Sequence, residues 1–426
     1  MTASALLLYR LGSALFAPLA PRFLAWRAAR EKEDASRLAE RLGHAKVARP
    51  LGPLVWLHGA SIGEGLALLP LVDMLTRDGA HALVTTGTRS SARVVGERLP
   101  PGAIHQYAPL DCARFARRFL DHWRPDAAVF AESELWPNLL LEAHGRSIPL
   151  FLANARMSVR SVARWRRAPR AAAELLDVFE AIFAQSAEDA KRFSGLGATR
   201  VVQAGNLKYD VAPPPADPQA LAQLTAMIGA RPVWVAASTH AGEEEMCLAA
   251  HTILRLRFPD LLTIIAPRDA RRGRDIAALA RQTGGRPALR SASDRITVET
   301  DVLIADTFGE MGLWYRLAPQ VFVGKSLIEG GGQNPIEPAK LGAAILHGPW
   351  VENFADAYAA LDAAGGGMRV NDATELASRL AALFSDPAQA RGIARAAHST
   401  VEQLSGATRV VARTVQRALA ARGGAT

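Results

Sequence analysis

A run of three glycines followed by polar residues is the stretch of this chain best suited to bind a ligand. Residues 321–342 are VFVGKSLIEGGGQNPIEPAKLG. Glycine lacks a Cβ atom, so its backbone can approach a ligand closely. Asn334 is placed to cap a helix with Pro335 as its first residue and Glu337 as its third. Such a helix start after a buried strand favours an anion, for example a nucleotide phosphate. A plain strand-to-helix connection is the alternative, but it needs one glycine at most.

A second turn of this kind lies near the other end of the sequence. The apolar residues 54–57 lead into HGASIGEG at 58–65 and then into an apolar-rich helix. Ser61 is placed to cap this helix, and Glu64 then lies in its first turn, where the helix dipole favours a carboxylate. Glu64 is therefore either a helix-capping residue or a catalytic base, and this motif leaves both open.

The elements that must position these turns form a regular pattern. Short apolar runs alternate with helical stretches, which is typical of βαβ units and a parallel sheet. The expected strands are residues 54–57, 82–86, 104–108, 127–131, 150–153, 181–184, 201–204, 233–236, 261–266, 302–304, 320–323 and 343–346.

A proline-rich segment, DVAPPPADP at 210–218, interrupts this pattern and predicts a stiff linker. A helical tail is expected over 387–422. The length of 426 residues also fits two domains. We therefore expect two doubly wound α/β domains that face each other across a cleft, with both glycine-rich turns opening into it.

Composition and charge limit the partners. A net charge of +9 and a pI near 10.0 indicate an anionic partner. No zinc-finger spacing, RNP-type aromatic motif or basic zipper is present, so nucleic acid is disfavoured. Residues 156–170, RMSVRSVARWRRAPR, contain six arginines and no acid. With Met157 and Trp165 they predict a basic and apolar surface suited to lipid headgroups, whereas a solvated helix face is the alternative. Two distant cysteines, Cys112 and Cys247, indicate a reducing compartment.

The N-terminal 26 residues are mostly apolar but are interrupted by Arg10, Pro18, Pro21 and Arg22. A clean spanning helix needs about 20 apolar residues, so a membrane anchor that lies on the bilayer or spans it weakly is expected, with a helix packed on the protein as the alternative. The basic residues that follow predict that the globular part is cytoplasmic.

Other ligand motifs are missing from the sequence. No G-x-G-x-x-G follows a first strand, no P-loop occurs, and no D-x-D pair is present to hold Mg²⁺ on a diphosphate. Glu132 and Glu134 form an E-S-E motif that is either a metal-binding pair or, more simply, the sign of a helix start before Pro137. Glu243, Glu244 and Glu245 are expected in the solvated first turn of a helix, and His240 as a loop residue with or without a ligand.

Several motifs in order resemble one family. They are GASIGEG, AESELWPNL (131–139), LANARMS (152–158), GNLKYD (205–210), ASTHAGEEE (237–245), APRDARR (266–272), DTFGEMG (306–312) and GGGQNPIEPA. Together they resemble the 3-deoxy-D-manno-octulosonic acid (Kdo) transferases of lipopolysaccharide core assembly, over nearly the whole chain. Lys325 departs from the family pattern, which has a second glycine after Gly324.

The resemblance implies an inverting GT-B glycosyltransferase that moves Kdo from CMP-Kdo to lipid IVA without a metal or a further cofactor. Glu64 would be the general base, and Glu132 and Lys208 would support the transition state. The residues implied to bind the donor are Pro267, Arg268, Phe308, Gly309, Glu310, Asn334, Pro335, Ile336 and Glu337.

The implied organisation is a membrane anchor at 1–30, an acceptor domain at 31–209, the linker at 210–218 and a donor domain with the helical tail at 219–426. The enzyme would act at the cytoplasmic side of the bacterial inner membrane. The alternatives are another GT-B nucleotide-sugar enzyme, such as a heptosyltransferase or an epimerase, and a non-catalytic lipid-binding protein of the membrane surface.

Overall fold

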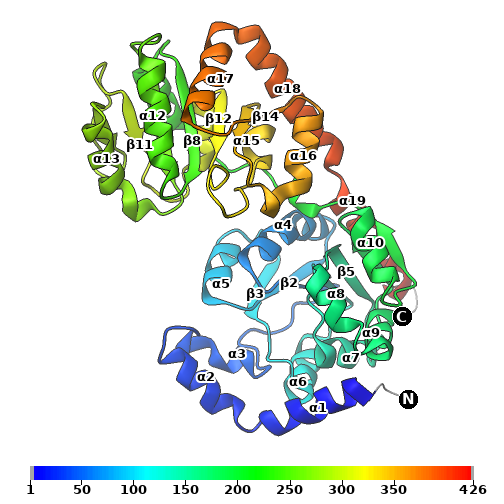
Figure 1. The fold of residues 1–426 in the computed structure, drawn as a ribbon. Helices are drawn as coiled ribbons and strands as arrows, with labels where there is room; N and C mark the ends of the chain where they lie inside the picture. The colour runs from blue at the N-terminus through cyan, green and yellow to red at the C-terminus, as the bar shows by residue number, and fades with distance from the viewer. Residues whose placement is uncertain (1–3, 424–426) are drawn as a thin grey trace. The chain divides into compact units, whose positions relative to one another are not determined.

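The computed structural model describes residues 4–423 and separates into two compact units. The first unit combines the chain up to Val211 with the chain from Ser405 onward, and the second is Ala212–Leu404. Each unit has a parallel sheet of seven strands in its described part, with helices packed on it (Figure 1). The predicted pair of doubly wound α/β domains is confirmed.

The sheet of the first unit has the order β3-β2-β1-β4-β5-β6-β7. Strand β1 (Leu54–His58) pairs on both sides, with Leu57 opposite Val84 of β2 and Val129 of β4. The strands are β1 (Leu54–His58), β2 (His81–Thr86), β3 (Ala103–Tyr107), β4 (Ala127–Ala131), β5 (Leu150–Ala155), β6 (Ala181–Ala184) and β7 (Val201–Gln203).

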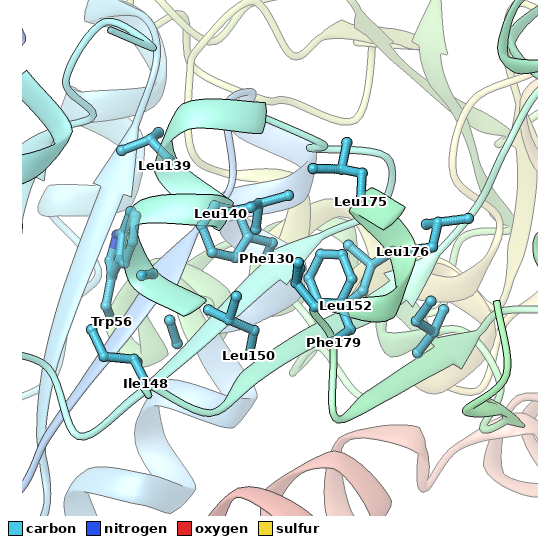
Figure 2. Packing of buried hydrophobic residues seen from close by; sticks show 14 of the residues in the cluster. Trp56, Phe130, Leu139, Leu140, Ile148, Leu150, Leu152, Leu175, Leu176 and Phe179 are labelled. Carbon is cyan, nitrogen blue, oxygen red and sulfur yellow. The ribbon is translucent and has the colours of Figure 1, made fainter. Parts of the chain in front are cut away.

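Two apolar cores cover the two faces of this sheet, because side chains alternate along a strand. Leu54 and Trp56 point to one face and Val55 and Leu57 to the other. On the first face the Trp56 ring lies 4.9 Å from that of Phe130, centroid to centroid. Figure 2 shows this core, in which leucines of α7 and α9 pack onto the strands. The helices of the unit are α1 (Ser4–Phe16), α2 (Ala20–Ala28), α3 (Leu38–Arg41), α4 (Ile62–Arg77), α5 (Arg89–Gly96), α6 (Ala113–Trp123), α7 (Pro137–His144), α8 (Val159–Trp165), α9 (Pro169–Asp177), α10 (Ala187–Ser194) and α19 (Ala407–Gly423), with short 3-10 turns η1 (Ala35–Arg37) and η2 (Leu207–Tyr209).

The second unit repeats this plan, with the sheet order β10-β11-β9-β8-β12-β13-β14. Its strands are β8 (Val233–Thr239), β9 (Leu262–Pro267), β10 (Pro287–Leu289), β11 (Val302–Ile304), β12 (Gln320–Val323), β13 (Ala344–His347) and β14 (Gly367–Arg369). Its helices are α11 (Pro218–Ile228), α12 (Glu243–Arg255), α13 (Gly273–Gln282), α14 (Met311–Leu317), α15 (Ile336–Lys340), α16 (Ala355–Ala363), α17 (Ala373–Ser385) and α18 (Pro387–Leu404), with 3-10 turns η3 (Ala270–Arg272) and η4 (Glu352–Phe354).

The predicted helical tail is not one element and does not stay with the second unit. It breaks at Gly406, whose φ of 116° an L side chain rarely adopts, so α18 and α19 are separate helices. Asp210 accepts hydrogen bonds from the backbone N–H groups of Gly406 and Thr408, at 2.5 and 2.7 Å. Val411 and Val415 are buried in the core beside α4. The tail therefore completes the first unit; residues 424–426 lie outside the described chain.

The N-terminal segment forms two helices that meet at a bend of 69°. Within residues 4–423, no single helix is long and apolar enough to cross a membrane, whereas α1 and α2 together satisfy length and composition. One face of α1 is docked: Leu6 is buried, and the Tyr9 hydroxyl donates to Asp111 at 2.9 Å. The other face leaves large apolar side chains exposed, namely Leu7, Leu8, Leu11 and Leu15. Membrane anchoring stays a prediction; residues 1–3 lie outside the described range.

Asp111 joins three elements of the first unit. Asp111 precedes α6 but does not cap it, because α6 has Cys112 at its N-cap without a side-chain bond. Asp111 instead caps α7, because it accepts from the backbone N–H groups of Asn138 and Leu139 at 3.1 and 2.8 Å. It also holds the Tyr9 hydroxyl of α1.

We expect Asp111→Ala to lower the free energy of unfolding by about 2–4 kcal/mol, because a buried cap and its partners lose their bonds. Asp121→Ala is the matched control, since Asp121 is exposed and only pairs with Arg146; its effect should stay under about 1 kcal/mol. Urea unfolding measures both. Equal losses would show that Asp111 has no special structural role.

Candidate active site

Several of the predicted functional residues lie where each sheet reverses its winding. In the first unit this point lies between β1 and β4, and in the second between β8 and β12, because the chain adds later strands on opposite sides of these pairs. Connections leave such a pair in opposite directions, so the carboxyl ends of the strands stay open to a ligand. Glu64 and Glu132 follow β1 and β4, and the glycine-rich loop follows β12.

Glu64 closes a capping box at the start of α4. The Ser61 hydroxyl accepts from the Glu64 backbone N–H at 3.3 Å, and Glu64 Oε2 accepts from the N–H groups of Ala60 and Ser61 at 2.7 and 3.3 Å. The predicted cap is confirmed. Among the described residues, hydrogen bonds reach this carboxylate through Oε2 alone, so Oε1 is left for another partner.

The surroundings of Glu64 favour its protonated form. Burial raises the pKa of the Glu64 carboxyl, and the negative charges of Glu134 and Glu132 raise it further, against the hydrogen bonds from Ser61 and Ala60. A carboxylate with a raised pKa is a stronger base once it has lost its proton. The capping carboxyl of Glu64 is therefore less acidic than an ordinary glutamate side chain.

Glu132 and Lys208 form an ion pair beside this site. Lys208 Nζ lies 3.0 Å from Glu132 Oε1, and both side chains are about three-quarters buried or more, at 27% and 19% exposure. The φ of Glu132 is 50°, in the left-handed region, and its N–H donates to the Ala153 carbonyl at 2.9 Å. A strained backbone of this kind is typical of functional positions. A helix, α7, does start at Pro137, as the simplest interpretation of the E-S-E motif predicted, but its N-cap residue is Trp136 and not Glu132.

Lys208 itself is held by a network of amide side chains. Asn206 Oδ1 accepts from the Lys208 N–H at 2.9 Å, and Asn154 Oδ1 accepts from the Leu207 N–H at 2.9 Å. Asn154 also has a positive φ of 53°. The sequence did not identify Asn154, although asparagine tolerates this conformation better than most residues.

Glu134 has a separate set of partners. The Trp136 indole N–H donates to Glu134 Oε2 at 2.6 Å, and His58 Nε2 lies 3.4 Å from the same oxygen. Burial works to raise the pKa of Glu134, but His58 and Trp136 outweigh it and hold this pKa below its ordinary value. Glu134 is therefore the ionised neighbour that acts on Glu64.

In the second unit a buried carboxylate holds the glycine-rich loop. Glu243 is completely buried, and it accepts from the N–H groups of Lys325, Ser326 and Leu327 at 2.6, 2.9 and 3.0 Å, and of His240 at 3.0 Å. The expectation of a solvated turn is wrong for Glu243. It is wrong also for Glu244, which is buried against Arg272 at 2.6 Å, and it holds only for Glu245.

The loop itself is folded tightly. Lys325 has a φ of 57°, which explains why a glycine suits this position. A Cβ at Gly324 would come within 2.6 Å of the Ser238 carbonyl oxygen, so strand β8 admits no side chain there. Gln333 Nε2 lies 3.2 Å from His240 Nε2, which joins the loops after β8 and β12. Burial lowers the pKa of His240, and the nearby Lys325, Arg268 and Arg272 lower it further.

The helix after this loop starts one residue later than predicted. α15 begins at Ile336 and has five residues, and Pro335 occupies its N-cap position. Asn334 still caps it, because Asn334 Oδ1 accepts from the Ile336 N–H at 3.0 Å, and its amide donates to Glu337 at 3.2 Å. Pro335 and Ile336 are buried, so only Asn334 and Glu337 offer side chains to a ligand here.

The remaining predicted donor residues follow β9 and β11. Pro267 ends β9, and the Arg268 side chain is exposed while its N–H donates to Thr239. Phe308 is 80% exposed and Gly309 has a φ of 83°. Glu310 is paired with Arg290 at 2.7 Å through two hydrogen bonds. No group of three His, Cys, Asp or Glu side chains within the described chain is arranged to hold a metal ion.

The arginine-rich segment of the first unit forms α8 and the start of α9. All six arginines from Arg156 to Arg170 are exposed, as predicted. Met157 is buried instead of joining this surface, because its N–H donates to Asp189 at 3.0 Å and its side chain enters the core. Val159 is exposed and Trp165 is half-buried.

We expect Glu243→Ala to lower the free energy of unfolding by about 3–5 kcal/mol, because four N–H groups, two of them in fully buried hydrogen bonds, lose their acceptor. The matched control is Glu245→Ala in the same helical turn, where an exposed carboxylate accepts from one N–H; about 0.5–1 kcal/mol is expected. Urea unfolding gives both values, and amide hydrogen exchange at residues 325–327 should accelerate only in Glu243→Ala. Unchanged exchange there would contradict the bracing role.

Comparisons with known proteins agree with this arrangement. Residues 36–211 match the family described as 3-deoxy-D-manno-octulosonic-acid transferase (kdotransferase). The chain is 36% identical over 414 residues to a probable mitochondrial 3-deoxy-D-manno-octulosonic acid transferase of Arabidopsis thaliana, covering 93% of this chain and 92% of the relative. It is 34% identical over 374 residues to the transferase of Bordetella pertussis, covering 86% and 87%.

Solved structures support the fold. A glycosyltransferase from Rickettsia africae matches with a TM-score of 0.60 at 11% identity, covering 87% of this chain and 99% of that one. A UDP-GlcNAc 2-epimerase from Neisseria meningitidis matches with a TM-score of 0.58 at 12% identity, covering 86% and 100%. These likenesses confirm the predicted GT-B class. The identity to curated relatives over most of their length goes further: this chain belongs to the Kdo transferase family.

Proposed function

We propose that the chain is an inverting Kdo transferase that uses CMP-Kdo as donor and lipid IVA as acceptor, without a metal. The observation that carries this proposal is Glu64, a carboxylate with a raised pKa and an unused oxygen, beside the Glu132–Lys208 ion pair. An acceptor alcohol is a weak nucleophile, so a positioned base must take its proton as the new bond forms.

The bond changes follow from these charges. The acceptor oxygen attacks the anomeric carbon of Kdo while its proton passes to Glu64 Oε1, and the bond from that carbon to CMP breaks. The sugar gains positive charge and the CMP phosphate gains negative charge. Glu132 and Lys208 together supply one charge of each sign, which suits this transition state.

The second unit is proposed to bind CMP. Arg268 is exposed at the end of β9 and suits the single phosphate. Asn334, Glu337 and Glu310 offer polar side chains for the ribose and cytosine, with Pro267, Phe308, Gly309, Pro335 and Ile336 shaping the loops around them. Transfer then requires this unit to present the donor to Glu64. The helix dipole is a weaker support for phosphate than the sequence suggested, because α15 has only five residues.

The cytoplasmic side of the bacterial inner membrane is the proposed location. The exposed apolar side chains of α1 and the exposed arginines of the 156–170 segment lie in the same unit. Apolar and basic side chains together suit a membrane with anionic headgroups. Lipid IVA is itself an anionic lipid, so it would be met at this surface.

Glu64→Gln separates the two roles of Glu64. Glutamine can complete a capping box but cannot accept the proton, so we expect an unchanged melting temperature and a kcat lower by about 10²–10⁴-fold. The assay is transfer from CMP-Kdo, generated in situ, to lipid IVA with product mass as readout, and Glu97→Gln, at an exposed position, is the control. A chelator should leave the wild-type rate unchanged. Full activity in Glu64→Gln would reduce Glu64 to a cap.

The pH dependence gives an independent check. A base acts when it is deprotonated, so kcat/KM should fall as the pH drops through the raised pKa of Glu64. Glu134→Gln removes the negative charge that raises this pKa, so its acidic limb should move to lower pH. Glu188→Gln, at an exposed glutamate of α10 in the same unit, should not move it. A shift to higher pH in Glu134→Gln would refute the electrostatic argument.

A further inference from the structure

An apolar pocket of about 320 Å³ opens in the first unit between α1, the 133–137 segment and the α8–α9 turn. Leu6, Leu135, Pro137 and Trp165 contribute its large apolar walls. Three small residues, Ala5, Ala168 and Ala171, leave the space between these walls unfilled. A pocket of this size with mainly hydrocarbon walls suits an apolar ligand.

The polar groups of the wall do not change this character. Glu134 lines the pocket, and the Trp136 indole N–H and His58 Nε2 both contact its Oε2. The other polar wall residues are Ser133 and Tyr9, and the Tyr9 hydroxyl donates to Asp111. Burying a sugar or phosphate against the remaining walls would cost its hydrogen bonds with water. A saturated hydrocarbon chain has no such bonds to lose.

The residues around the pocket indicate what kind of molecule would carry this hydrocarbon chain. Trp165 and Ala168 of the wall alternate along the sequence with exposed arginines, Arg164, Arg166 and Arg167. Next to Leu6 on α1, Leu7 and Leu8 are exposed to solvent at 52% and 69%. A ligand with an acyl chain and an anionic headgroup matches both features.

The position of the pocket connects it to the proposed reaction. One segment that lines the pocket starts at Ser133, the residue directly after Glu132. The same segment includes Glu134, whose negative charge raises the pKa of Glu64. A bulk membrane lipid would need no such proximity, whereas an acceptor would. We propose that this pocket binds one acyl chain of the acceptor lipid and so positions its hydroxyl at Glu64; this inference rests on the proposed function and names a subsite for it.

The test uses acceptors that share the same phosphorylated disaccharide and carry stepwise shorter acyl chains, kept as monomers below their critical micelle concentration and without detergent. Each methylene buried from water contributes about 0.8 kcal/mol, so wild-type kcat/KM should fall about fourfold per methylene once the chain is too short to fill the pocket. Ala168→Phe fills the pocket and should give low kcat/KM with little dependence on chain length. Ala163→Phe, at an exposed position of α8 outside the pocket, controls for the added aromatic side chain and should behave as wild type. Equal chain-length dependence in all three proteins would overturn the proposal.

A binding measurement separates this inference from the reaction. Lipid IVA with bromine at its chain ends should quench tryptophan fluorescence in wild type and in Ala163→Phe, and less in Ala168→Phe at equal melting temperature. Equal quenching of all three would overturn the pocket. Brominated phosphatidylglycerol is the comparison lipid. If it quenches to the same extent, and if Ala168→Phe reduces that quenching equally, the pocket accepts any membrane lipid and the acceptor assignment is overturned. Normal selective quenching without transfer would refute the proposed function alone.

Discussion

The reversal of winding at the centre of each parallel sheet is the constraint on which both candidate sites depend. Strands β1 and β4, and likewise β8 and β12, are neighbours in space but are reached by connections that leave in opposite directions. Backbone groups at their carboxyl ends consequently lack the cover that a crossover helix would give. The loops after these strands therefore need other hydrogen-bond partners, and carboxylate side chains supply them in both units.

In each unit, a carboxylate in the first turn of the following helix accepts hydrogen bonds from loop N–H groups, but the two carboxylates differ in how many they accept. Glu64 after β1 and Glu243 after β8 both reach back to bind loop N–H groups. Glu243 is saturated by four of them and holds a loop in place. Glu64 accepts two through one oxygen and remains half-buried. The same structural device thus braces a loop in one unit and holds the proposed general base in the other.

The sequence predicted those features of the structure that depend on residues close together in the chain. Every expected strand is present, because buried parallel strands are continuous apolar runs; β10 and β14 were missed because three residues such as Gly367–Arg369 form no such run. Ser61 and Glu64 were recognised because a capping box lies within four residues. The burial of Glu243 was not predicted, since three of its four hydrogen-bond partners lie more than 80 positions away. Three acidic residues at a helix start are also explained equally well by the helix dipole. The likeness of motifs identified Lys208 and Glu132 but gave no indication of the left-handed backbone of Glu132 and Asn154.

The return of α19 to the first unit has a consequence for how the protein is made. The first unit cannot be completed when its own 211 residues leave the ribosome, because Val411 and Val415 still have to cover the core beside α4. Residues 212–404 must be synthesised in between, which takes on the order of 10–40 s at typical elongation rates. During that interval the second unit emerges as an uninterrupted segment and can fold first, while apolar surface on the earlier unit waits for its last helix. A nascent chain of this topology is a natural client for chaperones, and truncation just before residue 405 would leave that surface permanently uncovered.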